Sequence, residues 1–326
     1  MNPEPLFTTR TDLSELNQAV QAIRDEVGKV IVGQTQMIDL LLAGLLSNGH
    51  VLIEGVPGVA KTLTAKLLAK CIATPFSRIQ FTPDLMPSDV LGTSVYNPRD
   101  SGFEFRPGPI FSSIILIDEI NRAPAKTQSS LFEVMEERQV TVDGKTHMMT
   151  KPFMVLATQN PIEHEGTYRL PEAQLDRFLF KINVPYPGLD EEVLILRHHH
   201  SQDGDMPLDK ISPVLNASNI AQLQQVIRTI HVEEKLLTYI AALIQETRNN
   251  KSIFLGASPR ASVAVLNASK AIAGMHGRDF VTPDDIVYVL HPVLRHRIML
   301  TPEKEMEGIS PDEVIRQMIQ HIEIPR

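Results

Sequence analysis

The chain has 326 residues, a formal net charge of −8 at pH 7, 43% hydrophobic residues and 21% charged residues. This length is enough for two domains with large buried cores, and the composition is that of an ordinary soluble globular protein. The acidic balance argues against a dedicated nucleic-acid-binding protein, which usually carries a basic surplus, so we expect no nucleic-acid partner.

Targeting and redox features point to the cytoplasm. The segment Met1–Arg10 has no apolar core of the kind found in a secretory signal, and no apolar run approaches a membrane helix of about 18–20 residues. The single cysteine, Cys71, excludes a disulfide framework and reads best as a small buried hydrophobic residue. We therefore expect a cytoplasmic protein that is not inserted in a membrane.

The first third of the chain predicts two helices and then a strand, a glycine-rich turn and a third helix. Apolar residues at helical spacing predict the first helices over residues 12–30 and 35–47. The apolar run Val51–Ile53 predicts the strand, and the third helix covers residues 63–72. A strand, loop and helix in this order are typical of a phosphate-binding loop, because the backbone N–H groups of the turn and of the helix N-terminus attract an anion.

The turn between this strand and this helix reads Gly55-Val-Pro-Gly-Val-Ala-Lys-Thr62. Lys61 is expected to contact the outer phosphates of a nucleotide, and the Thr62 hydroxyl to bind Mg²⁺. Ala60 stands where a glycine is usual, which is tolerated if its backbone angle φ is negative and resisted if φ is positive. The residues expected to contact the nucleotide here are Gly55, Val56, Pro57, Gly58, Val59, Ala60, Lys61, Thr62 and Leu63.

Two segments interrupt the regular pattern further along the chain. Prolines and glycines rule out a long regular element between residues 82 and 110, where the pairs Val95–Tyr96 and Phe103–Phe105 predict the arms of a hairpin. A second hairpin is predicted over residues 139–149, because Asp143-Gly144 is a strong turn signal. We expect both hairpins to project toward a partner.

Acidic and amide residues follow two buried strands. The apolar strand Ile114–Ile117 ends in Asp118 and Glu119, and ligands of parallel sheets lie beyond the carboxyl ends of the strands. Asp118 would hold Mg²⁺ and Glu119 would polarise an attacking water. Asn160 follows the strand Phe153–Ala157, which we expect between the other two active-site strands, and would position water; taken alone, a turn residue before Pro161 is the favoured interpretation.

The order of elements predicts an α/β fold followed by a helical domain. Nearly all-apolar strands that alternate with helices predict a parallel sheet covered by helices on both faces. After Pro187 only helices are predicted, near residues 189–200, 220–228, 233–248, 259–275 and 283–290. We therefore predict a nucleotide-binding domain over residues 1–187 and a smaller all-α lid domain over residues 188–326.

Two arginines lie at positions in the sequence that a bound anion would explain. Arg177 precedes the last predicted strand, over residues 178–184, which we place at the sheet edge. Arg260 lies in the first turn of a predicted helix, where its charge opposes the helix dipole at a cost of about a few tenths of a kcal/mol. A surface salt bridge explains each arginine equally well when it is taken alone.

The order of these signals resembles the AAA+ ATPases and, more narrowly, the MoxR family, over nearly the whole chain. The segments that carry the resemblance are Val30-Ile-Val-Gly-Gln34, Gly55-Val-Pro-Gly-Val-Ala-Lys-Thr62, Phe105-Arg-Pro-Gly-Pro-Ile-Phe111, Leu116-Ile-Asp-Glu-Ile-Asn-Arg122, Ala157-Thr-Gln-Asn-Pro161 and Leu170-Pro-Glu-Ala-Gln-Leu-Asp-Arg-Phe178. MoxR-like proteins carry an alanine before the lysine of the loop, which fits Ala60. The resemblance implies a P-loop AAA+ core with ATP and Mg²⁺ as cofactors.

The resemblance also implies roles for single residues. Asn160 matches sensor 1, Arg177 the arginine finger and Arg260 sensor 2. Arg177 is then expected to work on the ATP of a neighbouring subunit, whereas Arg260 is expected to carry the lid to the outer phosphate. The residues that would border the adenine are Ile31, Val32, Gly33 and Gln34.

Family members resemble ring-forming chaperones that remodel partner proteins, often proteins with a von Willebrand factor A domain. We therefore expect an ATP-hydrolysing homo-oligomeric ring, a hexamer, that acts on a client protein. The alternatives are a magnesium-chelatase-like motor subunit, a DNA-acting AAA+ ATPase and a nucleotide-binding scaffold without turnover. The acidic charge argues against the DNA-acting protein, and the presence of Glu119 and Arg177 argues against the scaffold.

Overall fold

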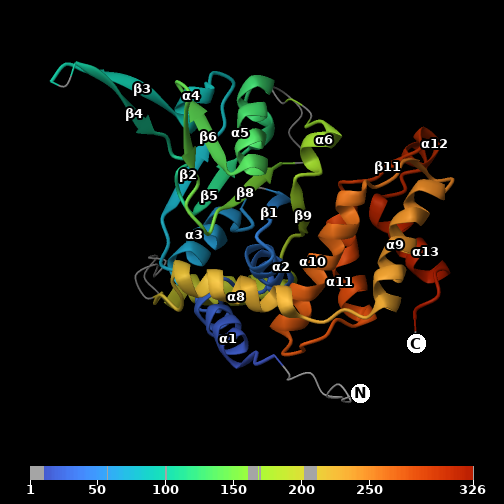
Figure 1. The fold of residues 1–326 in the computed structure, drawn as a ribbon. Coiled ribbons are helices and arrows are strands. Elements are labelled where there is room, and N and C mark those ends of the chain that lie inside the picture. Colours follow the sequence, from blue (N-terminus) through green and yellow to red (C-terminus); the bar gives the residue numbers. More distant parts are fainter. Residues whose placement is uncertain are drawn as a thin grey trace, which may run out of the picture.

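The computed structural model describes residues 11–56, 58–99, 101–160, 168, 170–201 and 211–325. Figure 1 shows a central sheet with helices on both faces, and a mostly helical part that contains the C-terminus. Pro57 of the predicted loop lies outside the described residues. None of the described helices is both long and apolar enough to cross a membrane.

The elements of the first part follow the predicted order closely. They are α1 (Ser14–Gly28), α2 (Thr35–Leu46), β1 (His50–Gly55), α3 (Lys61–Cys71), β2 (Phe76–Gln80), α4 (Pro87–Leu91), β3 (Gly92–Asn97), β4 (Gly102–Pro107), β5 (Ile114–Asp118), α5 (Ala125–Glu137), β6 (Gln139–Val142), β7 (Lys145–Met148), β8 (Met154–Gln159), α6 (Glu172–Leu175) and β9 (Phe178–Val184). A short 3-10 helix, Ile120–Arg122, follows β5.

The central sheet has the strand order β2-β5-β8-β1-β9, and all neighbouring strands are parallel. The carboxyl ends of the strands therefore meet at one edge of the sheet. The prediction that the strand before Asn160 lies between the other two active-site strands is confirmed, because β8 pairs with β5 on one side and with β1 on the other. The predicted edge position of the last strand, β9, is also confirmed.

Each face of the sheet has its own apolar core. One core joins α1, α2 and α3 to the sheet and continues into α10 (Pro259–Met275) and α11 (Pro283–Leu294) of the C-terminal part. The other core packs α5 and Val90 of α4 against the opposite face. The predicted parallel sheet between two helical layers is therefore confirmed, and the lid shares a core with the nucleotide domain.

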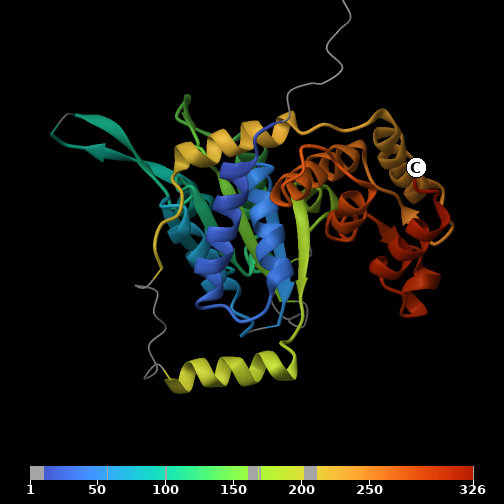
Figure 2. The same ribbon diagram turned by 90° about the horizontal axis from the view of Figure 1, so that it is seen from below.

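Both predicted hairpins form. Strands β3 and β4 pair antiparallel and extend as a long arm that is set apart from the body in two perpendicular views (Figures 1 and 2). Near its tip Tyr96 and Phe103 form an edge-to-face pair with centroids 5.5 Å apart, and they are 52% and 74% exposed. The β6–β7 hairpin lies beside the base of this arm, because His147 stacks on Phe105 at 4.2 Å.

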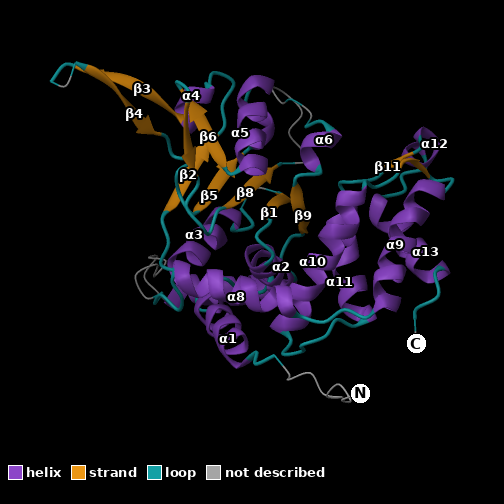
Figure 3. Ribbon diagram, in the orientation of Figure 1, coloured by secondary structure: helices purple, strands orange, loops and turns teal. Residues whose placement is uncertain are grey.

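The C-terminal part is mostly helical, as predicted, but it is not all-α (Figure 3). Strand β10 (Ile253–Leu255) pairs antiparallel with β11 (Met299–Leu300), and neither was predicted, because a strand of two or three residues carries too few positions to show a periodicity. The other elements are α7 (Leu189–Ser201), α8 (Ala217–Thr229), α9 (Glu234–Asn249), α12 (Pro302–Met306) and α13 (Pro311–His321). The domain boundary at residue 187 stays a prediction.

A buried arginine fastens the lid to the edge of the sheet. The side chain of Arg297 is only 3% exposed, and its Nε donates to Asp176 Oδ1 at 2.7 Å. Its Nη atoms donate to the backbone carbonyls of Asp176, Phe178 and Leu179. Burial lowers the pKa of Arg297 and the Asp176 carboxylate raises it. The cation therefore keeps its charge inside the interface only because these oxygens surround it.

Candidate functional site

The loop after β1 has the shape of a phosphate-binding loop. Gly58 and Ala60 both have left-handed backbone angles, with φ values of 89° and 57°. Helix α3 starts at Lys61, and its first backbone hydrogen bond runs from Thr64 N to Ala60 O at 2.9 Å. Ala60 therefore has the positive φ that the sequence analysis named as the unfavourable case. This backbone conformation costs about 1–2 kcal/mol for a residue with a Cβ atom.

A pocket of about 510 Å³ brings the predicted catalytic residues together. Lys61 and Thr62 line it from the start of α3, Asp118 and Glu119 from the end of β5, and Asn160 from the end of β8. These residues are far apart in sequence and meet because β1, β5 and β8 are adjacent parallel strands. The pocket therefore offers a cation, a hydroxyl, two carboxylates and an amide to one ligand.

Asp118 is the more buried of the two carboxylates, with a side chain that is 9% exposed. Its Oδ2 accepts a hydrogen bond from Arg78 Nε at 2.6 Å, and its Oδ1 accepts one from Thr158 Oγ1 at 3.1 Å. The Thr62 hydroxyl and this carboxylate line the same pocket, and such oxygen ligands suit Mg²⁺. Among the residues that the structure describes, no cluster of three or more His, Cys, Asp or Glu side chains could hold a metal ion.

Glu119 is held in a strained and well-defined position. Its backbone is left-handed, with φ at 57°, and its N–H donates to Thr158 Oγ1 at 3.1 Å. Its Oε2 accepts a hydrogen bond from Gln80 Nε2 at 2.8 Å and lies 3.0 Å from Arg122 Nε. A left-handed non-glycine residue persists only where the surroundings enforce it, and such residues cluster at functional sites.

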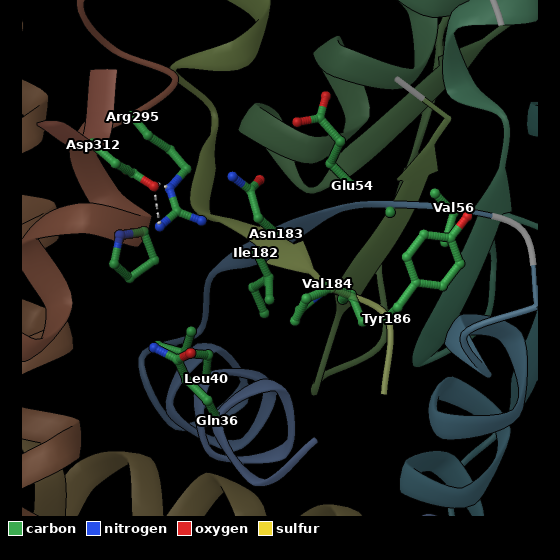
Figure 4. A pocket seen from close by; sticks show the side chains of 13 residues that line it. Gln36, Leu40, Glu54, Val56, Ile182, Asn183, Val184, Tyr186, Arg295 and Asp312 are labelled. Atoms are coloured by element: carbon green, nitrogen blue, oxygen red, sulfur yellow. Dashed lines mark hydrogen bonds and ion pairs between the residues drawn. The ribbon is translucent and has the colours of Figure 1, made fainter. Parts of the chain in front are cut away.

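A second pocket of about 510 Å³ lies on the other side of the loop (Figure 4). Gly55 and Val56 line it together with residues of α2, β9, α11 and α13. Figure 4 shows the Tyr186 ring beside Val56 at one end and an ion pair between Arg295 and Asp312 at the other, with Nη2–Oδ2 at 3.1 Å. The loop therefore contributes to two pockets, and we call the one at Lys61 and Asp118 the polar pocket, because most of its lining residues are charged or polar.

The segment predicted to border the adenine touches the loop but lines neither pocket. Ile31 is buried in the core, 5% exposed, with Val32 beside it in the chain. Gln34 Nε2 donates to Val59 O at 3.0 Å. Gly33 is covered by the Glu191 side chain of α7, whose Oε1 would lie 2.0 Å from a Cβ atom at this position. Contact of this segment with adenine stays a prediction.

Arg177 and Arg260 lie together, away from the residues that line the polar pocket. Arg177 Nε is 3.5 Å from Glu136 Oε2, and Arg260 Nη2 is 2.7 Å from Glu136 Oε1. Arg260 therefore contacts Glu136 and does not line the pocket, and its contact with the nucleotide stays a prediction. The attachment of the lid accounts for this position, because Ser258, at the start of α10, donates to Asp176 Oδ2 at 2.9 Å and holds this helix end beside Arg177.

Several residues of the site were missed at the sequence level. Arg78 and Gln80 flank the buried Ile79 in β2, and this alternation puts both side chains on one face of the strand, where they reach Asp118 and Glu119. That polar alternation was a usable signal. No sequence signal pointed to the roles of Arg122, Glu136 and Thr158, because each role depends on which elements become neighbours in the fold.

Comparison with known proteins identifies the family. Residues 50–180 match the ATPase family associated with various cellular activities (AAA), and residues 245–318 match the AAA lid domain. The uncharacterised protein YeaC of Bacillus subtilis is 47% identical, over 92% of this chain and 93% of its own length. The chaperone MoxR1 of Mycobacterium tuberculosis is 45% identical, over 92% of this chain and 81% of its own.

A solved structure supports the same assignment. It is a protein of Cytophaga hutchinsonii, described provisionally as an ATPase, with a TM-score of 0.88 and 41% identity over 96% of this chain and 97% of the other. This likeness covers nearly the whole length of both chains. The chain belongs to the MoxR family of AAA+ ATPases.

Proposed function

We propose that this chain binds MgATP and hydrolyses it at the loop of residues 55–63. The observation that supports this most directly is the gathering of Lys61, Thr62, Asp118, Glu119 and Asn160 around one pocket. The phosphates would occupy this pocket, and the base would extend past Gly55 and Val56 toward the second pocket, beside Tyr186. Aromatic and aliphatic walls with a few polar groups are typical of sites for a flat organic group.

Each residue then has one physical role. Lys61 would neutralise charge on the outer phosphates, and Thr62 and Asp118 would hold Mg²⁺, which bridges the phosphate oxygens and screens their charge. Glu119 would orient and polarise the attacking water, and the neutral amide of Asn160 would hold that water against the terminal phosphate. Phosphoryl transfer needs positioning and charge stabilisation more than covalent chemistry, so these few groups are enough.

Arg177 and Arg260 would complete the site of a neighbouring subunit. Both are displaced from the pocket of their own chain and share one carboxylate, Glu136. Two partly exposed guanidinium groups with a single anionic partner suit a phosphate that approaches from outside the chain. This proposal requires a homo-oligomeric ring, for which we propose a hexamer.

We further propose that the ring remodels a client protein in the cytoplasm, with a von Willebrand factor A domain as the expected client module. The likeness to the chaperone MoxR1 supports a chaperone more than a magnesium-chelatase-like motor. The exposed aromatic pair Tyr96 and Phe103 on the β3–β4 arm supports contact with another protein.

Two variants test the chemical part of this proposal. Lys61→Ala should weaken binding of a fluorescent ATP analogue, whereas Glu119→Gln should bind it normally and release no phosphate. Phosphate release by Glu119→Gln at the wild-type rate would contradict the role of Glu119. ATPase assays with added DNA, and reconstitution with a magnesium chelatase, would separate the alternative functions.

A further inference from the structure

Helix α7 is set apart from the rest of the chain. Figure 2 shows it as a yellow-green helix that lies away from the lid helices and from the helices on the sheet. Its N-terminal end is nevertheless anchored beside the nucleotide loop, because Glu191 covers Gly33 and accepts a hydrogen bond from Gly188 N at 2.9 Å. The helix therefore projects from the side of the molecule that carries the nucleotide site.

The middle of α7 is apolar, although both ends of the helix are charged or polar. Its middle is a run of four aliphatic residues, Val193–Leu196, and these are 37%, 42%, 42% and 68% exposed. Four consecutive positions at about 100° each point all round a helix, and a helix that is hydrophobic all round is normally buried. In a protein that works as a single chain, this helix would leave a continuous apolar surface in water.

Exposed apolar residues also lie on the lid before and after Arg260 in the sequence. Phe254 and Leu255 of β10 are 72% and 49% exposed, and Val263 of α10 is 56% exposed. Val263 lies three residues after Arg260 and therefore on the same face of α10. We name Phe254, Leu255 and Val263 the lid patch.

We propose that α7 of one subunit packs on the lid patch of the next copy of this chain. The inference rests on the proposed delivery of Arg177 and Arg260 to a neighbour's nucleotide. If Arg260 reaches that nucleotide, the lid patch beside it must approach the nucleotide side of the neighbour, which is the side from which α7 projects. The two apolar surfaces would then cover each other as the composite site closes.

The charges at the rims of the two surfaces agree with this pairing. The first turn of α7 carries three acidic residues, Asp190, Glu191 and Glu192. The basic residues nearest to the lid patch along the chain are Lys251, which is exposed, and Arg260, whose side chain is 54% exposed. Opposite charges at the rim orient two surfaces during encounter, while the apolar contact supplies most of the affinity. A second copy of this chain is therefore the partner whose chemistry fits.

Chemical cross-linking tests the contact directly. Leu196→Cys and Phe254→Cys proteins, each also carrying Glu119→Gln so that ATP stays bound, should form a covalent dimer when they are mixed with ATP and a short bismaleimide. The matched control is Leu196→Cys mixed with Tyr96→Cys, which lies on the distant β3–β4 arm (Figure 1) and should give no dimer. The native Cys71 does not interfere, because it is buried and burial raises its pKa to about 11.

A second measurement covers the strength of the contact. Sedimentation with ATP should show that Leu196→Asp associates about 10-fold or more weakly than wild type, because one buried leucine is lost and a charge is added. The affinity for a fluorescent ATP analogue should be unchanged, since Leu196 lines neither pocket. Met306→Asp on α12, where the side chain is 82% exposed, is the control and should associate normally.

The outcomes separate this inference from the proposed function. Rings that form without the Leu196–Phe254 cross-link, equal cross-linking of the Tyr96 control, or normal association of Leu196→Asp would each overturn the packing of α7 on the lid patch. Activity can be measured in rings that mix Glu119→Gln subunits with Arg177→Ala subunits. If the cross-link forms but these mixed rings stay inactive, the contact is supported and the trans role of the arginines is contradicted. If the mixed rings regain activity but the cross-link does not form, the trans role is supported and the contact is contradicted.

Discussion

Arg177 and Arg260 share one carboxylate, that of Glu136: Arg260 donates to both oxygens, at 2.7 Å from Oε1 and 3.3 Å from Oε2, and Arg177 Nε lies 3.5 Å from Oε2. The arginines come from different domains of the predicted organisation, and Glu136 comes from the end of α5. Their side chains are 27% and 54% exposed, so a third charged group could reach them from outside. They therefore form one basic unit rather than two separate arginine sites.

Subunit mixing should show that this unit acts on a neighbour. Arg177→Ala, Arg260→Ala and Glu119→Gln should each be nearly inactive alone, since an arginine supplied from outside contributes about 10³–10⁵ in rate. Mixed rings of Glu119→Gln with either arginine variant should regain phosphate release, because some sites combine an intact Glu119 with both intact arginines. The mixture of Arg177→Ala with Arg260→Ala should stay inactive, because no subunit then supplies both arginines.

The position of Arg260 also shows where sequence reasoning stopped. The loop at Lys61, the acidic pair at Asp118, and the central place of β8 and edge place of β9 could be predicted, because each follows from a short local pattern or from the rules of parallel sheets. The position of Arg260 depends on how the lid docks, and that is fixed by Arg297 and Asp176, which are 121 residues apart. No periodicity or motif links two such positions, so the lid arginine was expected at the nucleotide of its own chain.

The β3–β4 arm should matter for partner-dependent activity and not for folding. Replacing both Tyr96 and Phe103 by serine removes an exposed aromatic pair that belongs to neither of the two apolar cores. We expect unchanged thermal unfolding and unchanged basal ATP hydrolysis, with reduced stimulation by a client. Phe105→Ser is the structural comparison, because Phe105 stacks on His147 and contacts Phe111 at the base of the arm. Unfolding of the Tyr96/Phe103 variant would show that the tip of the arm is part of the fold.

Removing the buried cation at the lid interface should destabilise the whole chain. Arg297→Ala leaves the Asp176 carboxylate and several carbonyls without their donor, and breaking such a buried pair costs about 3–5 kcal/mol. Denaturant unfolding should show this loss. Arg316→Ala on the exposed face of α13 is the matched control and should stay within about 0.5 kcal/mol of wild type. An equally small effect of Arg297→Ala would show that the lid is held by its apolar core alone.

The left-handed alanine in the loop should respond to glycine. Ala60→Gly removes the Cβ atom that opposes a φ of 57°, which we expect to raise the free energy of unfolding by about 1 kcal/mol. Ala22→Gly in α1 is the control of opposite sign, because glycine inside a helix costs about 0.5–1 kcal/mol. Thermal unfolding of both variants measures the difference. A lower stability of Ala60→Gly would mean that the freedom gained by the unfolded chain outweighs the strain.

His50 should make the fold sensitive to acid. Its Nδ1 accepts a hydrogen bond from Val155 N at 3.0 Å and its Nε2 lies 3.1 Å from Met135 O, so the buried ring is neutral with the proton on Nε2. Burial, and to a smaller extent the charge of Arg138, lowers the pKa of His50 from its usual value of 6.5 to about 3. Between these two values the unfolded chain binds the proton and the folded chain does not, so stability falls as the pH drops from about 6.5 toward 3, by up to about 1.4 kcal/mol per pH unit. His50→Gln has an amide that can accept from one partner and donate to the other without titrating. Unfolding of this variant should therefore take up one proton fewer than unfolding of wild type, so its free energy of unfolding should depend less steeply on pH. An identical slope would contradict a neutral His50.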